Sequence, residues 1–174
     1  MIMLAEEIVS LPSSVIAIGA FDGVHQGHQE LINQSVRRSK ILGVPSVVYT
    51  FDPPPRCFFQ GVRMLTTVEE KVERILSLGI DHIVIANFDE VYTSRKPLDF
   101  VTDLTRLAPR ELLVGKDFRF GRNREGDINL LSEYFPVRIT EPVYCPDGQM
   151  ISSTRIRKLL AQGDIQKSCV LLGW

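Results

Sequence analysis

Short apolar runs alternate with longer amphipathic stretches along most of the 174-residue chain. Unbroken runs of apolar or β-branched residues predict buried strands rather than half-exposed ones, because strands covered on both faces lose the alternation of apolar and polar positions. A weaker run near the end of the chain predicts one more strand. The expected strands are 15–18, 46–51, 82–86, 111–114 and 137–140.

The stretches between these runs repeat their apolar residues at helical spacing. Gly43 and Gly79 follow two of them, where a residue with positive φ commonly closes a helix. The expected helices are 26–42, 68–78, 97–107, 128–134, 153–162 and 164–172. A Pro-Asp-Gly turn within 143–151 predicts a small hairpin.

The alternation of strands and helices predicts an α/β fold, with a doubly wound, mainly parallel sheet and helices on both faces. No internal repeat, low-complexity segment or linker interrupts the pattern, so residues 1–174 are expected to form one domain.

Composition narrows the classes of function. A formal net charge of −1 gives no basic footprint for nucleic acid or anionic membranes. No apolar run approaches the roughly 20 residues of a membrane helix, and the N-terminus lacks the basic start of a signal peptide. Cys57, Cys145 and Cys169 are too far apart for a thiolate metal site and predict free thiols. We therefore expect a cytoplasmic protein that binds neither nucleic acid nor membranes.

The first candidate site is the loop Gly-Ala-Phe-Asp-Gly-Val-His-Gln-Gly-His over 19–28, between the first strand and the first long helix. Free amides and the positive dipole end of a helix bind anions. Gly19 and Gly23 allow the backbone to pass close to a phosphate. His25 and His28 share one face of the first helical turn and can donate hydrogen bonds to phosphate oxygens, most strongly when protonated.

Other readings of this loop fail on spacing. Neither G-x-G-x-x-G after the strand nor G-x-x-x-x-G-K-[ST] is present, so dinucleotide-binding and P-loop interpretations are excluded. A metal site is not expected, because His82 is the only other histidine and begins a predicted buried strand.

The second candidate site is Ile-Ser-Ser-Thr-Arg-Ile-Arg over 151–157. Hydroxyl residues there predict a helix cap. Arg157 lies about one turn into that helix, from which its guanidinium can reach a phosphate beside the hydroxyls.

Taken together, the two segments resemble the nucleotidylyltransferase superfamily that carries an HxGH signature. More narrowly, the chain is similar to the FMN adenylyltransferase domain of bacterial FAD synthetase, a bifunctional riboflavin kinase/FMN adenylyltransferase family. The narrower resemblance covers nearly the whole chain. It rests on Thr-Phe-Asp-Pro-Pro-Pro at 50–55, Gly-Lys-Asp-Phe-Arg-Phe-Gly at 115–121 with Gly-Asp at 126–127, and the tail from Leu159 to Gly173.

The resemblance implies a Rossmann-like nucleotidylyltransferase fold and adenylyl transfer from ATP to FMN, with Mg²⁺, giving FAD and pyrophosphate. It assigns His25, His28 and Arg157 to catalysis by stabilising phosphate charge. The implied nucleotide-binding residues are Gly19, Phe21, Asp22, Gly23, Gly27, Ser153 and Thr154. The implied flavin-binding residues are Phe51, Pro53, Pro54, Pro55, Phe59 and Asp117.

The chain departs from the family in two places. Pro54 stands where the family usually has histidine in Pro-His-Pro, which puts the acceptor in question. The riboflavin kinase domain that follows in bifunctional members is absent from these 174 residues, so that domain is expected either to be a separate protein or to have been removed.

Two other functions remain open at this point. One is a related nucleotidylyltransferase that uses CTP or another phosphorylated acceptor, and the other is a flavin- or nucleotide-binding module without catalysis. Phe118 and Phe120 lie among Arg119, Arg122 and Arg124, a mixture that can bind single-stranded nucleic acid. A loop over the substrate is favoured instead, because binding residues concentrate on loops.

Overall fold

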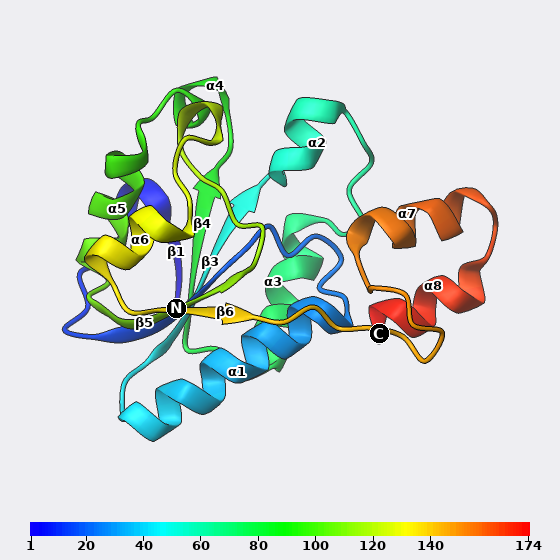
Figure 1. Ribbon diagram of the computed structural model, residues 1–174, viewed down its shortest axis with the longest axis horizontal. Coiled ribbons are helices and arrows are strands. Elements are labelled where there is room, and N and C mark those ends of the chain that lie inside the picture. Colours follow the sequence, from blue (N-terminus) through cyan, green and yellow to red (C-terminus); the bar gives the residue numbers. More distant parts are fainter.

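The computed structural model describes residues 1–174. Six parallel strands form one sheet in the order β1-β4-β3-β2-β5-β6 (Figure 1). The strands are β1 (Ile2–Leu4), β2 (Ser14–Ile18), β3 (Ser46–Asp52), β4 (His82–Asn87), β5 (Pro109–Gly115) and β6 (Val137–Thr140). The α-helices are α1 (Gln26–Leu42), α2 (Pro55–Gln60), α3 (Val68–Ser77), α4 (Glu90–Thr93), α5 (Pro97–Arg106), α6 (Ile128–Tyr134), α7 (Ser153–Ala161) and α8 (Ile165–Leu172). Short 3₁₀ turns lie at η1 (Ala5–Glu7) and η2 (Arg122–Arg124).

Strand β2 shows why these strands are apolar throughout. Ile16 and Ile18 point to the face covered by α5 and α6, whereas Val15 and Ala17 point to the face covered by α1 and α3. All four residues are buried. Because successive side chains of a strand point to opposite faces, burial on both sides leaves no polar position within the run. The expected doubly wound α/β sheet with helices on both faces is confirmed (Figure 1).

All five predicted strands and all six predicted helices are present, with ends shifted by at most two residues. The predicted hairpin is present as an antiparallel bridge between Tyr144 and Met150. Three short elements were missed, namely β1, α2 and α4. The three residues of β1 and the single turn of α4 are too short to show periodicity, and α2 begins in a proline run that reads as a loop.

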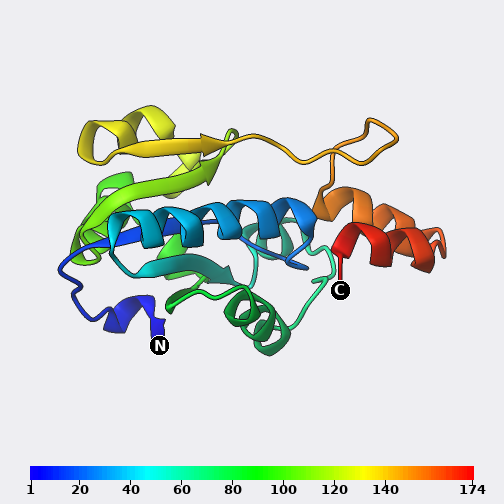
Figure 2. The same cartoon turned by 90° about the horizontal axis from the view of Figure 1, so that it is seen from below.

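Helices α7 and α8 lie together beyond the end of the sheet, next to the amino-terminal end of α1 (Figures 1 and 2). Their own small core contains Ile151, Ile156 and Leu171. Leu65, from the segment before α3, packs against it. This packing carries the second candidate segment, 151–157, to the loop that follows β2.

The segment after β5 folds back on itself through an antiparallel bridge between Phe120 and Gly126. Gly121 begins this loop with a φ of 73° and lies against Pro97. A Cβ placed on Gly121 would come within 2.8 Å of the Pro97 ring and 2.9 Å of its backbone nitrogen. The position therefore requires glycine for both its backbone conformation and its close contact.

Gly148 has nearly the same φ, 75°, but nothing within 4 Å of the added Cβ. We predict that Gly148→Ala lowers the free energy of unfolding by about 1–2 kcal/mol, the cost of left-handed backbone at alanine. Gly121→Ala should cost about 1–3 kcal/mol more, because its ψ of 174° belongs to a conformation essentially restricted to glycine and because Pro97 must also move. Urea denaturation of the two variants measures the difference, and equal losses would contradict the close contact at Gly121.

Candidate active site

The loop 19–28 lies where the strand order reverses. From β2 the chain passes to β3 on one side of β2, and it later returns to place β5 on the other side. In open parallel sheets, ligands bind beyond the carboxyl ends of the strands at this reversal. The loop follows the carboxyl end of β2 and leads directly into α1.

His25 and His28 form a stacked pair at the start of α1, as their spacing predicts. Their ring centroids are 3.6 Å apart and the ring planes differ by 18°. His25 is the N-cap residue, and its Nδ1 accepts a hydrogen bond from the backbone N–H of His28 at 3.4 Å. An accepting Nδ1 places the proton of a neutral imidazole on Nε2. His25 is therefore set to donate a hydrogen bond from Nε2.

Both imidazoles are neutral near pH 7 in the free protein. Burial lowers the pKa of His25 to about 4. Burial, followed by the positive charges of His25 and Lys71, lowers the pKa of His28 well below its usual range. The Nδ1 atom of His28 is buried and has no hydrogen-bond partner within the protein. Each ring can still donate to a phosphate as a neutral N–H group.

The glycines of this loop allow close packing around the histidines. A Cβ on Gly19 would lie 2.9 Å from the ring of Phe21, which is buried. A Cβ on Gly27 would lie 3.2 Å from the His25 ring and 3.6 Å from the carbonyl oxygen of Ile151. Gly27 thus lies between the histidine pair and the beginning of the second segment.

Asp22 joins the two candidate segments. Its carboxylate is almost fully buried and forms an ion pair with the guanidinium of Arg157. It also accepts a hydrogen bond from the backbone N–H of Leu65 at 2.8 Å. The Ser153 hydroxyl donates to the backbone carbonyl of Asp22 at 2.9 Å. In the free protein, Arg157 therefore faces a carboxylate of the first loop, three residues before His25.

Two further contacts fix the start of α7. The Nε atom of Arg157 donates to the carbonyl of Arg63 at 2.7 Å. Thr154, which is exposed, accepts a hydrogen bond from Arg56 of α2. Ser152, rather than Ser153, is the N-cap residue of α7. The hydroxyl of Ser153 is thus free to bind the Asp22 carbonyl.

The residues expected at the flavin site occupy different environments. Phe51 is 6% exposed and belongs to the sheet core, whereas Phe59 is 65% exposed on α2. Pro54 and Pro55 form the amino-terminal end of α2, and the peptide before Pro53 is cis. Helix α2 follows the carboxyl end of β3, and the histidine loop follows the carboxyl end of the parallel neighbour β2. Both therefore begin at the same end of the sheet.

Phe88 was not anticipated from the sequence. Its ring meets those of Phe58 and Phe59 nearly at right angles, with centroids 5.6 Å and 5.7 Å away. We call Phe58, Phe59 and Phe88 the aromatic cluster. Phe88 directly follows β4, so its place after a predicted strand could have signalled it.

The loop after β5 contributes little free aromatic surface. Phe118 and Phe120 stack at 5.8 Å, and both rings pack on Phe100 of α5. Asp117 is exposed at the carboxyl end of β5. The inward rings do not form a stacking platform for single-stranded nucleic acid.

Lys71 of α3 is a second residue that the sequence analysis missed. Its side chain is buried, and Nζ donates to the carbonyl of Phe51 at 2.6 Å. Burial lowers the pKa of Lys71, and the negative charges of Asp52 and Asp22 oppose this shift. Lys71 occupies an apolar-face position of its helix, between Val68 and Ile75, and a charge at such a position was the available signal.

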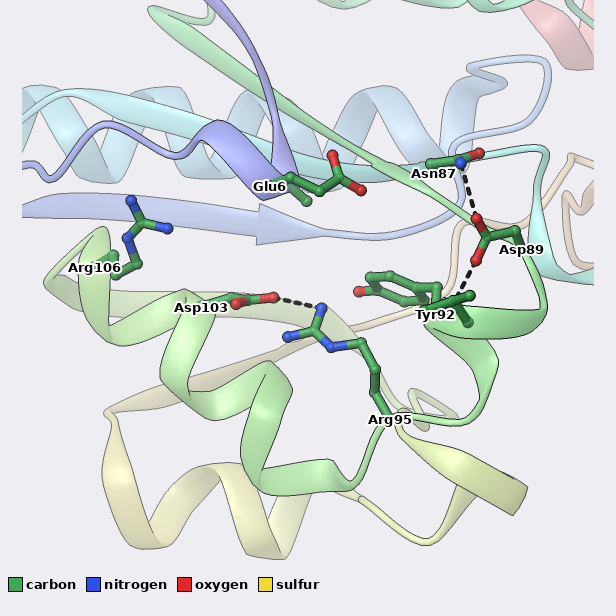
Figure 3. Close-up of a pocket in the computed structure, with 9 residues that line it drawn as sticks. Glu6, Asn87, Asp89, Tyr92, Arg95, Asp103 and Arg106 are labelled. Atoms are coloured by element: carbon green, nitrogen blue, oxygen red, sulfur yellow. Dashed lines mark hydrogen bonds and ion pairs between the residues drawn. The ribbon is translucent and has the colours of Figure 1, made fainter.

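A separate cavity of about 280 Å³ lies at the sheet edge, beside η1, α4 and α5 (Figure 3). Three of its charged groups are already engaged, since Arg95 pairs with Asp103 at 2.8 Å and Asp89 accepts from Asn87 and from the N–H of Tyr92. None of the expected site residues lines it. We therefore take the two segments joined by Asp22, and not this cavity, as the candidate active site.

Solved structures support the fold. A Streptococcus pneumoniae protein titled macrolide-efflux protein superposes over 99% of this chain and 61% of its own, with a TM-score of 0.87 and 26% identity. A pantoate-beta-alanine ligase from Francisella tularensis superposes over 86% of this chain and 72% of its own, with a TM-score of 0.53 and 16% identity, a similarity that supports the fold alone.

No helix of this chain has the length and apolar character to cross a membrane.

Curated relatives are named for flavin metabolism. A Geobacillus thermodenitrificans protein, named "Putative bifunctional riboflavin kinase/FMN adenylyltransferase", is 61% identical over 170 residues, which are 98% of this chain and 95% of that protein. The Escherichia coli K12 enzyme of the same name is 35% identical over 91% of this chain, but the match spans only 54% of the E. coli protein. A family model described as FAD synthetase matches residues 8–155. The chain belongs to the FAD synthetase family.

Proposed function

We propose that this chain is the FMN adenylyltransferase of its family and transfers the adenylyl group of ATP to FMN, giving FAD and pyrophosphate. The observation that carries the proposal is the junction of the two candidate segments through Asp22, at the reversal of strand order. Membership of the FAD synthetase family identifies the reaction as nucleotidyl transfer. Without that contact, the histidine loop and Arg157 would be two unrelated helix ends.

In the proposed reaction, a phosphate oxygen of FMN attacks the α-phosphorus of ATP, and the bond from that phosphorus to the bridging oxygen of pyrophosphate breaks. No covalent intermediate with the enzyme is required. The protein then has to align two anions and stabilise the charge that develops on pyrophosphate. Neutral N–H donors from His25 and His28 suit both tasks, because they can hold phosphate oxygens and stabilise the developing charge without adding positive charge to a buried site before ATP binds.

Arg157 supplies the fixed positive charge in this proposal. In the free protein Asp22 neutralises it, so the guanidinium does not stand unpaired in a partly buried site. Its five donors can bind Asp22 and a phosphate oxygen at the same time. At the amino-terminal end of α7, Thr154 adds a hydroxyl donor beside it, whereas the O–H of Ser153 must leave the Asp22 carbonyl before it can donate to a phosphate.

Mg²⁺ enters the proposal with ATP as the substrate complex. A family that uses ATP is consistent with a divalent cation. Phosphate oxygens are preferred ligands of Mg²⁺, which usually keeps several waters and few protein ligands.

For the acceptor, the aromatic cluster offers apolar ring faces and edges, nearly perpendicular to one another, against which one face of an isoalloxazine ring can pack. It extends the expected set of Phe51, Pro53, Pro54, Pro55, Phe59 and Asp117 by Phe88. Pro54 cannot donate the hydrogen bond of a histidine side chain, so the ring must be held mainly by stacking.

A product assay tests the substrate pair. Incubation with Mg²⁺ and ATP should convert FMN to FAD, while CTP in place of ATP, or pantetheine phosphate or nicotinamide mononucleotide in place of FMN, should give no dinucleotide. Chromatography of the products distinguishes these cases. A dinucleotide formed from another acceptor would overturn the flavin assignment, and binding of both substrates without pyrophosphate release would favour a binding module.

Riboflavin kinase activity is predicted to be absent. The described elements, from Ile2 to Leu172, form one sheet with its helices and the attached α7–α8 pair. We propose that these 174 residues are a single nucleotidylyltransferase domain. Incubation with riboflavin and ATP should yield neither FMN nor FAD, and the appearance of FMN would contradict this reading.

His28→Ala should lower kcat for FAD formation by about 100- to 1,000-fold, as the loss of one charge-stabilising donor does in other enzymes. The matched control is His82→Ala, because His82 begins β4 at the opposite end of the sheet from the loop. His82→Ala should leave kcat near the wild-type value. Near-normal turnover in His28→Ala would remove the assigned role.

The lowered pKa values predict the pH behaviour of the histidines. In the His82→Ala protein, the NMR signals of His25 and His28 should stay in the neutral form from pH 8 down to about 5, because burial opposes protonation until pH nears 4 for His25. A bound non-hydrolysable ATP analogue should raise the midpoint of His25 by one unit or more, since phosphate charge favours the cation.

Titration of His25 near the ordinary midpoint of about 6.5 in the free protein would contradict its buried environment. A midpoint that does not respond to the analogue would place the polyphosphate elsewhere.

A further inference from the structure

Two residues of the histidine loop have backbone angles that their side chains disfavour. Phe21 has a φ of 49° and Val24 a φ of 43°. Positive φ is a genuine outlier for bulky and β-branched residues and is energetically unfavourable at each position. Such strain persists only where the surrounding structure over-determines the conformation. What holds the loop therefore also sets the position of His25, which follows Val24.

The backbone carbonyls of the loop are held from outside it. Arg74 of α3 donates to the carbonyl of Gly23 at 3.1 Å, and Ser153 of α7 donates to that of Asp22. The carbonyl of Val24 accepts two hydrogen bonds, both of 2.8 Å. One comes from the side-chain amide of Gln29 and the other from the indole N–H of Trp174.

Trp174 is brought to Val24 by the docking of α8 on the start of α1, and the C-terminus lies at this junction in both views (Figures 1 and 2). The side-chain amide of Gln26 donates to the carbonyl of Val170 at 2.7 Å, and that of Gln29 donates to the carbonyl of Leu172 at 2.7 Å. These bonds fasten the last turn of α8 to the first turn of α1.

Arg74 completes the arrangement. Its guanidinium carbon lies 5.4 Å from the centroid of the Trp174 ring, within cation–π distance, while it donates to Gly23. The indole is therefore fixed in two directions: its face is packed on Arg74, and its N–H is directed at Val24.

We propose that Trp174 is a positioning residue for the histidine pair, acting through the carbonyl of Val24. The inference rests on the proposed adenylyl transfer, and it adds a role for α8, which lies outside both candidate segments, 19–28 and 151–157. Trp174 itself touches no phosphate in this account. Its indole N–H keeps Val24 in the left-handed conformation from which His25 caps α1 and stacks on His28.

Trp174→Phe tests this, because phenylalanine keeps an aromatic ring able to pack on Arg74 while it removes the N–H donor together with part of the indole ring area. We expect kcat for FAD formation to fall about tenfold, since a small misplacement of groups that stabilise a transition state is costly. KM for ATP should change less than about twofold, because the lost alignment acts on the transition state more than on bound ATP. Val170→Ala, on the exposed outer side of α8, is the matched control and should keep wild-type kcat and KM.

A second measurement needs no substitution, because Trp174 is the only tryptophan of the chain. Its single indole N–H resonance should be protected from exchange with water despite a residue exposure of 44%, owing to the bond to Val24. A non-hydrolysable ATP analogue should shift that resonance, as the loop takes up the phosphates.

Three results would overturn the proposal. They are wild-type kcat in Trp174→Phe, a loss of kcat accompanied by a collapse of the urea midpoint measured by circular dichroism, and an indole resonance that exchanges freely and ignores the analogue. None of these bears on the reaction itself. If wild-type protein makes no FAD, the proposed function fails, whereas if wild-type and Trp174→Phe proteins make FAD equally well, only the role of Trp174 fails.

Discussion

The carboxylate of Asp22 is the group on which the arrangement of the site depends. It is almost fully buried, so it requires a counter-charge and hydrogen-bond donors, and it finds Arg157 on α7 and the backbone of Leu65 before α3. Leaving one member of such a pair without its partner costs about 3–5 kcal/mol. Satisfying the buried carboxylate therefore holds together three segments that are far apart in the sequence, namely the histidine loop, the segment before α3 and the start of α7. The reversal of strand order places the histidine loop at the carboxyl end of the sheet, and Asp22 connects this loop to Arg157 of α7.

The same junction shows how the proposed anion site is organised before any anion binds. Burial lowers the pKa of both histidines, so neither carries a charge near neutral pH, and Asp22 balances Arg157. Lys71 is also buried and donates to the carbonyl of Phe51, and the negative charges of Asp52 and Asp22 favour its protonated form. The free protein thus holds hydrogen-bond donors and cations paired with carboxylates in place, so little uncompensated charge is buried at the proposed site before ATP binds. Donors positioned in advance are what an in-line transfer between two phosphates requires.

Much of the fold could be predicted from the sequence, because strands such as 15–18 and 46–51 are apolar throughout and the intervening helices are long enough to show their periodicity. The histidine loop could be placed as well, since a glycine-rich segment between a buried strand and a helix has few alternatives. The partners of that loop could not. Phe88, Lys71 and Trp174 enter through packing between distant segments, and no local pattern encodes which carbonyl a buried ammonium or an indole N–H will meet. Protonated histidines would bind phosphate most strongly, but burial keeps both neutral in the free protein, and this burial is a consequence of tertiary structure that the sequence pattern does not reveal.

A crystal structure of the chain with FMN and a non-hydrolysable ATP analogue tests the account most directly. The account predicts one triphosphate whose oxygens lie within hydrogen-bond distance of the Nε2 atoms of His25 and His28 and of the Arg157 guanidinium, with the flavin ring against Phe58, Phe59 or Phe88. A triphosphate that contacts only one of the two segments, or that binds in the cavity beside α4 and α5, would contradict it.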